Sequence, residues 1–118
     1  MRVSGHGRLL LPASRVSADR AGFNTPRYND DTGTQCGGSH FDKLTPSTCN
    51  ICGGRPGTRT FMAPGKYATG TITGEYRSGG TIKLKYQATA NHKGYFLVKL
   101  CKNNNVRKDT CTQADFDK

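Results

Sequence analysis

Hydrophobic and polar residues alternate along the second half of the chain. In Thr81–Ala90 the isoleucine, leucine, tyrosine and alanine residues occupy every second position, with threonine, lysine and glutamine between them. This period of two is typical of a β-strand that has one buried and one solvated face. Tyr95–Cys101 repeats the pattern, and Ala68–Tyr76 is rich in threonine, isoleucine and tyrosine. The pattern therefore predicts three consecutive antiparallel strands, which are usual in a β-sandwich.

The segment of residues 1–66 lacks this regularity. All five prolines and several paired glycines fall in it, and such residues are typical of turns and loops. Leu9–Leu11 is expected to start a strand that enters the core. Ser14–Ala21 is compatible with a short helix, with Ser14 as its N-cap and Gly22 as its stop. We therefore expect a long irregular N-terminal half and no second domain.

The composition indicates one small domain with a modest core. The chain has 118 residues, of which 33% are hydrophobic, and it contains no tryptophan. Domains of this size often need covalent cross-links. Disulfides are expected from the five cysteines, which are Cys36, Cys49, Cys52, Cys101 and Cys111. Because their number is odd, at least one cysteine has no partner in the chain. The spacing of the last two allows a disulfide between them.

The other three cysteines also allow a different interpretation. Cys36, His40, Cys49 and Cys52 are residue types that bind zinc, and the last two have the spacing of a zinc knuckle. A zinc site usually combines two such close pairs, and this chain has one. A redox role for the same Cys-x-x-Cys requires a strand followed by a helix, which the pattern lacks. Disulfides are therefore the favoured interpretation, with zinc as the alternative.

The net charge of +10 favours acidic partners such as nucleic acid. The basic residues are scattered, however, and no recognition helix or aromatic RNA-binding motif accompanies them. No segment approaches the roughly 20 apolar residues that span a bilayer. We therefore expect neither nucleic acid nor a membrane as a partner. The carboxylates form no acid–base spacing, and phosphate-binding and nucleophile motifs are absent from the sequence, which argues against hydrolytic catalysis.

Two histidines have an informative context. His6 follows Val3 and Gly5, which stand at the −3 and −1 positions of a signal-peptidase site. Cleavage there would make His6 the first residue, with an α-amine and an imidazole on one residue. His92 lies in a turn between two predicted strands. Together they offer three nitrogen ligands, a set that suits copper. His40 lacks such a context and is expected to be structural.

Ordered motifs along the chain resemble one protein family, the insect-type lytic polysaccharide monooxygenases, also described as chitin-binding type-4 domains. The motifs cover nearly the whole chain. They are His6-Gly7-Arg8-Leu9-Leu10-x-Pro12-x-Ser14-Arg15, Gly22-Phe23-x-Thr25-Pro26, Tyr28-Asn29-Asp30, Cys36-Gly37-Gly38, Cys49-x-Ile51-Cys52-Gly53, Gly65-Lys66-Tyr67-Ala68-x-Gly70, Ala90-Asn91-His92-Lys93-Gly94-Tyr95-Phe96 and Leu100-Cys101.

The resemblance implies an all-β protein with an immunoglobulin- or fibronectin-III-like β-sandwich and a disulfide-rich N-terminal half. It implies that copper is bound by the α-amine and ring of His6 and by the imidazole of His92, which are the expected catalytic residues. The implied activity is oxidative cleavage of glycosidic bonds in insoluble chitin or cellulose, with an external electron donor. A secreted, monomeric protein is expected.

Residues 1–5 are interpreted as the remnant of a signal peptide and residues 6–118 as the domain. The chain lacks closing strands and any match to the family's aromatic axial residue near copper. We therefore expect the domain to be truncated at its C-terminus. This expectation leaves enzymatic activity open. The alternative function is a non-catalytic chitin-binding module, and a nucleic-acid binder, suggested by charge alone, is the weakest hypothesis.

Overall fold

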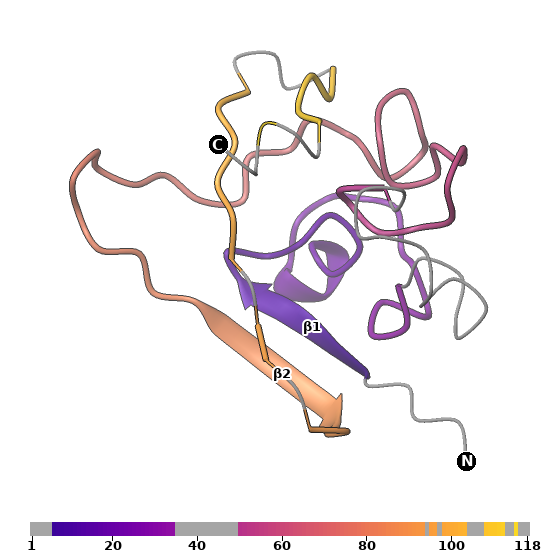
Figure 1. The fold of residues 1–118 in the computed structure, drawn as a ribbon, viewed down its shortest axis with the longest axis horizontal. Helices are drawn as coiled ribbons and strands as arrows, with labels where there is room; N and C mark the ends of the chain where they lie inside the picture. Colours follow the sequence, from indigo (N-terminus) through magenta and orange to yellow (C-terminus); the bar gives the residue numbers. More distant parts are fainter. Residues whose placement is uncertain are drawn as a thin grey trace.

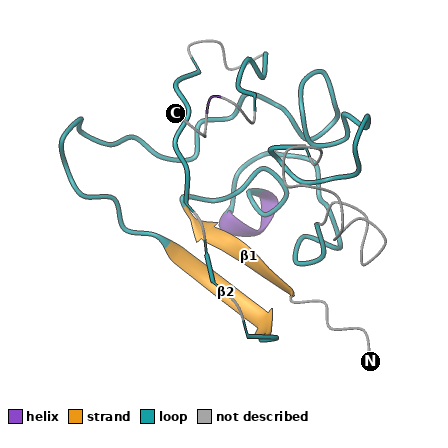
Figure 2. Cartoon of the chain, in the orientation of Figure 1, coloured by secondary structure: helices purple, strands orange, loops and turns teal. Residues whose placement is uncertain are grey.

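A computed structural model describes residues 6–34, 50–93, 95–96, 98–103, 108–112 and 115. Within these ranges the chain forms strand β1 (His6–Leu11), a 3-10 helix η1 (Asp19–Ala21) and strand β2 (Lys85–Ala90). The two strands pair as one antiparallel sheet, beside which η1 lies (Figure 1). Long loops make up most of the remaining described chain (Figure 2). The predicted all-β class is confirmed.

The register of the sheet places the start of β1 opposite the end of β2. His6 pairs with Ala90 and Leu9 with Tyr86, with irregularities directly after His6 and after Leu9. β1 ends before Pro12, which has no N–H to donate to a ladder. The strand expected to begin at Leu9 is therefore present and already begins at His6.

The predicted three-stranded meander is wrong. Within the range 81–90 only Lys85–Ala90 forms a strand, and its partner is β1. No strand forms in Ala68–Tyr76 or in the described residues of 95–101. The segment before β2 makes a wide excursion from the sheet (Figure 1). Alternation identifies residues that suit a half-buried strand, but contacts with the rest of the fold select the partner.

The segment that was compatible with a helix forms turns instead. The Ser17 N–H donates to the Ser14 carbonyl oxygen at 3.1 Å, and η1 begins only after Ala18, so Ser14 is not its cap. Gly22 stops the helix as expected, because its φ of 91° lies in the left-handed region that favours glycine. A hydrogen bond from Ser17 Oγ to Asp31 at 3.0 Å ties the turn to a distant loop. This tertiary contact favours the turns over a regular helix.

The core of the described chain lies among its loops. Its buried hydrophobic residues are Ala13, Val16, Ala18, Phe61 and Ala63. The Phe61 ring packs against the rings of Tyr28 and Tyr67, with centroid distances of 5.2 and 5.7 Å. Aromatic contacts in this range add to the stabilisation gained from burial. This core packs on the side of β1 that carries the turns and η1.

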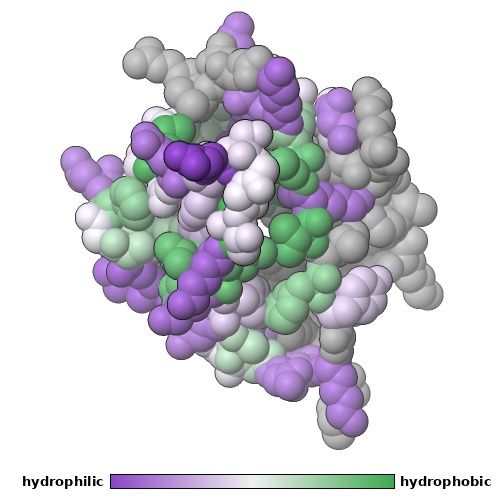
Figure 3. Space-filling view, turned by 90° about the vertical axis from the view of Figure 1, so that its left-hand side faces the viewer, coloured by the Kyte–Doolittle hydropathy of each residue, from purple (hydrophilic) through white to green (hydrophobic). Residues whose placement is uncertain are grey.

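The face of 81–90 that was expected to be buried is exposed. Ile82, Leu84 and Tyr86 keep 45%, 46% and 43% of their surface accessible, because no second layer covers them within the described part of the chain. Beyond β2, Phe96 and Leu100 are exposed further still. Seen from the side of the excursion, the surface shows hydrophobic residues between strongly hydrophilic ones (Figure 3).

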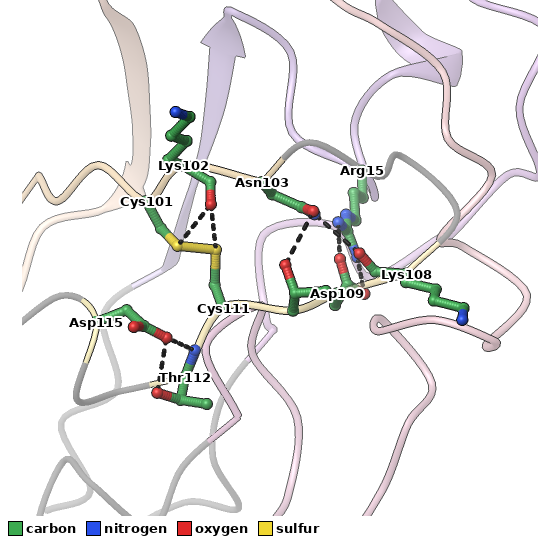
Figure 4. Close-up of a disulfide and its surroundings, with 10 residues drawn as sticks. Arg15, Cys101, Lys102, Asn103, Lys108, Asp109, Cys111, Thr112 and Asp115 are labelled. Atoms are coloured by element: carbon green, nitrogen blue, oxygen red, sulfur yellow. Dashed lines mark hydrogen bonds and ion pairs between the residues drawn. A yellow bond between two sulfur atoms is a disulfide. The ribbon is translucent and has the colours of Figure 1, made fainter.

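A disulfide joins Cys101 to Cys111, the bond that their spacing predicted (Figure 4). Their Cα atoms are 6.2 Å apart, within the usual range for disulfides. Cys52, by contrast, carries a half-buried free thiol, so the expectation that it forms a disulfide is not met. Burial raises the pKa of this thiol. Cys36, His40 and Cys49 lie outside the described residues, and with them most of the alternative zinc site.

An ion pair anchors the disulfide loop to the core (Figure 4). Arg15 Nη1 donates to Asp109 at 2.7 Å and to the Phe61 carbonyl oxygen at 2.8 Å, and Arg15 Nη2 makes a second contact with the same carboxylate. Asp109 also accepts a hydrogen bond from the Ala63 N–H. The hydrogen bond from Arg15 lowers the pKa of Asp109 below its ordinary value. One carboxylate thus connects three segments that are distant in sequence.

We expect Asp109→Asn to lower the free energy of unfolding by about 2 kcal/mol at pH 7. Removing one partner of a fully buried ion pair lowers stability by about 3–5 kcal/mol. The effect is expected to be smaller here because Arg15 keeps 35% of its side chain exposed, which lets water screen the charge. Because the pKa of Asp109 is lowered by folding, the stabilisation is complete above the ordinary value of about 3.9 and is lost as pH falls through the lowered pKa. Thermal unfolding of both proteins between pH 7 and about pH 2 measures this difference.

Asp19→Asn is the matched control, because it removes the carboxylate of the exposed Arg27–Asp19 pair. Surface pairs contribute less than about 1 kcal/mol. A loss in Asp109→Asn no larger than in Asp19→Asn, or one that persists unchanged in acid, would contradict the role of this pair.

Candidate functional site

The two histidines singled out by the sequence lie side by side at one end of the sheet. His6 is the first residue of β1, and His92 follows the last residue of β2 by two positions. Their ring centroids are 6.5 Å apart, and the ring planes meet at 74°. The antiparallel register explains this proximity, because it pairs His6 with Ala90. Two side chains far apart in sequence thus share one corner of the fold.

A tight turn holds His92 at the end of β2. The Lys93 N–H donates to Asn91 Oδ1 at 3.0 Å, across the histidine between them. Lys93 has a φ of 59°, in the left-handed region, which is uncommon for a lysine. An asparagine side chain that bonds the backbone two residues later is a common way to stabilise such a turn. His92 is exposed, so its ring is accessible from solvent.

The start of β1 is fixed from two sides. β2 pairs along one edge, and the Gly7 N–H donates to the Thr32 carbonyl oxygen at 3.1 Å. Tyr86 packs directly on Gly7: a Cβ added there would lie 1.9 Å from the tyrosine Oη. The same ring contacts Phe96, with centroids 4.2 Å apart. Any larger residue next to His6 would therefore have to displace the end of the Tyr86 ring.

We expect Gly7→Ala to lower the free energy of unfolding by about 1–2 kcal/mol, because the new methyl group forces the Tyr86 ring away. In a Tyr86→Ala background the same substitution is expected to cost much less, since the space is then free. Thermal unfolding of the two single variants and the double variant measures the coupling. Additive effects would show that the ring does not restrict this position.

The geometry of the two rings fits a shared metal ion. A metal–imidazole bond is about 2 Å long, so each ring centroid lies about 3 Å from the metal. The observed 6.5 Å between the two centroids would leave room for one ion held by both rings. Nitrogen ligands of this kind suit copper. The described residues contain no group of three or more histidine, cysteine, aspartate or glutamate side chains that could hold a metal.

A cavity in the described part of the chain lies elsewhere. It has a volume of about 230 Å³ and is lined by residues that follow β1, among them Ala13 and Arg15, and by several threonines. Several of its polar groups form hydrogen bonds within the protein, whereas the buried Thr25 Oγ1 has no hydrogen-bond partner in the described part of the chain. Thr73 Oγ1 donates to the Ala13 carbonyl oxygen at 2.9 Å, and Arg15 is bound to Asp109. Neither His6 nor His92 lines this cavity, so the candidate site remains the histidine pair.

Sequence reasoning missed two features of this site. One is the contact between Gly7 and Tyr86, for which a glycine inside a strand was the available signal. The other is the buried carboxylate of Asp31, which binds Arg8 of β1 at 2.8 Å. No local pattern indicates that pairing, because it joins residues that are 23 positions apart.

Comparison with known proteins agrees with the resemblance drawn from the motifs. The sequence model of a family described as "lytic polysaccharide mono-oxygenase, cellulose-degrading" matches residues 6–118. No curated protein and no solved structure gives a match. Among the described residues, no helix is both long and apolar enough to cross a membrane. Domains of the matched family are immunoglobulin-like β-sandwiches that generally depend on copper. The chain belongs to the lytic polysaccharide monooxygenase family.

Proposed function

We propose that the protein cleaves an insoluble polysaccharide oxidatively at a copper ion bound by His6 and His92. The observation that carries this proposal is the approach of the two rings to 6.5 Å across the β1–β2 register. The family match over residues 6–118 supplies the reaction class. One imidazole belongs to the first residue of β1 and the other lies two residues after the end of β2, so the pairing of the two strands brings them together.

The proposed ligand set has three nitrogens. His6 contributes its ring and, once residues 1–5 are removed on secretion, its α-amine, while His92 contributes a second ring. Copper bound there would supply one-electron redox chemistry, through which an external reductant and oxygen or peroxide would oxidise a carbon of the glycosidic linkage. The exposure of His92 suits this task, because a solid substrate has to reach the site from outside.

Either cellulose or chitin fits the proposal as substrate. The family description names cellulose, whereas the motifs resemble proteins described as chitin-binding. The test uses microcrystalline cellulose and β-chitin in parallel, with copper-loaded protein that begins at His6. Mass spectrometry of the soluble products is expected to show oxidised oligosaccharides from one solid or both, only when a reductant is present.

The controls separate the two functional hypotheses. Removal of copper with a chelator is expected to abolish the oxidised products, and adding Cu²⁺ back is expected to restore them. Binding to a solid without oxidised products, in copper-loaded protein supplied with reductant, would overturn the proposal in favour of a non-catalytic binding module.

A further inference from the structure

We propose that Asp31 is a positioning residue for the copper site, acting through Arg8 to hold the start of β1 and hence His6. This inference rests on the proposed function. Asp31 is an acidic residue with only 2% of its surface exposed. A buried carboxylate is unfavourable unless it is paired and hydrogen-bonded. Its partners therefore show which elements it holds together.

The Asp31 carboxylate binds three side chains from two segments. Arg8 Nη1 donates to both carboxylate oxygens, at 2.8 and 3.1 Å. Arg20 Nε lies 2.9 Å from Oδ2, and Ser17 Oγ donates to the same oxygen at 3.0 Å. Arg20 and Ser17 belong to the turns and η1, whereas Arg8 belongs to β1. The carboxylate therefore ties β1 to the segment that carries η1.

A neighbouring backbone contact strengthens this connection. The residue after Asp31, Thr32, accepts the hydrogen bond from the Gly7 N–H at 3.1 Å. Residues 31 and 32 thus hold residues 8 and 7, directly beyond His6. The first residues of a chain are usually poorly ordered unless they are tied down. A metal ligand at such a position needs a tether of this kind, because supporting contacts set how rigidly a ligand is held.

The two arginines around Asp31 provide a matched test. Arg8→Gln and Arg20→Gln each remove one guanidinium from the same carboxylate, but only Arg8 lies on β1. Both are prepared as chains that begin at His6. We expect Arg8→Gln to raise the dissociation constant for Cu²⁺ by about 10- to 100-fold, the usual effect of losing a contact that supports a ligand. Arg20→Gln is expected to change it by less than about threefold, because Arg20 binds the same carboxylate from the η1 segment and not from the strand that begins at His6.

Two further measurements distinguish positioning from general stability. The electron paramagnetic resonance spectrum of the Cu²⁺ protein is expected to broaden or show a second species in Arg8→Gln and to keep the parent form in Arg20→Gln. Hydrogen exchange in the metal-free protein is expected to speed up in a peptide covering residues 6–11 in Arg8→Gln alone. Arg8→Lys, which keeps the charge, is expected to recover part of the affinity.

The outcomes separate this inference from the proposed function. If the parent protein binds Cu²⁺ tightly and both glutamine variants behave alike in affinity and spectrum, Asp31 has no positioning role and this inference is wrong. If the parent protein does not bind Cu²⁺, the proposed function is wrong, and this inference is wrong with it.

Discussion

A chain that begins at His6 is expected to bind Cu²⁺ at least about a hundredfold more tightly than a chain that begins at Met1. This difference is expected to be larger than the effect of removing a supporting contact, because the longer chain lacks one of the ligands themselves. In the shorter chain the His6 nitrogen is a free amine, which can bind the metal together with the ring of the same residue. In the longer chain that nitrogen is part of a peptide bond and has no available lone pair. The imidazoles of His6 and His92 remain in both.

The affinity of the shorter chain is also expected to rise with pH. A free α-amine has an ordinary pKa of about 7.7–8.0 and has to lose its proton before it binds a metal. Proton competition therefore weakens binding at pH 6 and fades towards pH 8. Competition titrations with a chelator of known affinity measure both effects, and the shorter chain with an acetylated amine is the control. Equal affinities for the chains that begin at His6 and Met1 would contradict the role of the amine.

Replacing His92 with alanine is expected to abolish oxidised products from cellulose and chitin. The substitution removes one of the two imidazoles that the sheet brings to 6.5 Å. No group of three or more histidine, cysteine or acidic side chains elsewhere in the described ranges could replace it. We therefore expect weaker Cu²⁺ binding, by about a hundredfold or more, together with loss of reductant-dependent oligosaccharides in the mass spectrum.

The third histidine of the chain is the matched control for this prediction. His40→Ala makes the same chemical change at a position outside the described residues and is expected to leave products and Cu²⁺ affinity unchanged. Thermal unfolding checks that His92→Ala stays folded, as expected for an exposed residue. Unchanged product formation in folded His92→Ala would exclude this residue as a copper ligand.

The parts of this protein that follow from local chemistry could be predicted from the sequence. Pro12 marks the end of β1 because it lacks an N–H, and Gly22 stops η1 because it adopts a positive φ. The bond between Cys101 and Cys111 follows from a short connecting loop. The motifs identified the family, and through it the histidine pair. Each of these depends on the residue itself or on its near neighbours in the chain.

Only the tertiary structure decided which segments meet. Alternation in 81–90 predicted a strand, but it could not show that β2 would pair with β1 or that Ile82 would remain exposed. The chain has 18 basic residues, and composition does not select Arg8 and Arg20 as the partners of Asp31. A period of two fixes which face a side chain is on, whereas pairing depends on the free energy of contacts between distant segments. The proximity of His6 and His92 depends on such contacts, because the register of β1 against β2 sets the distance between the two rings.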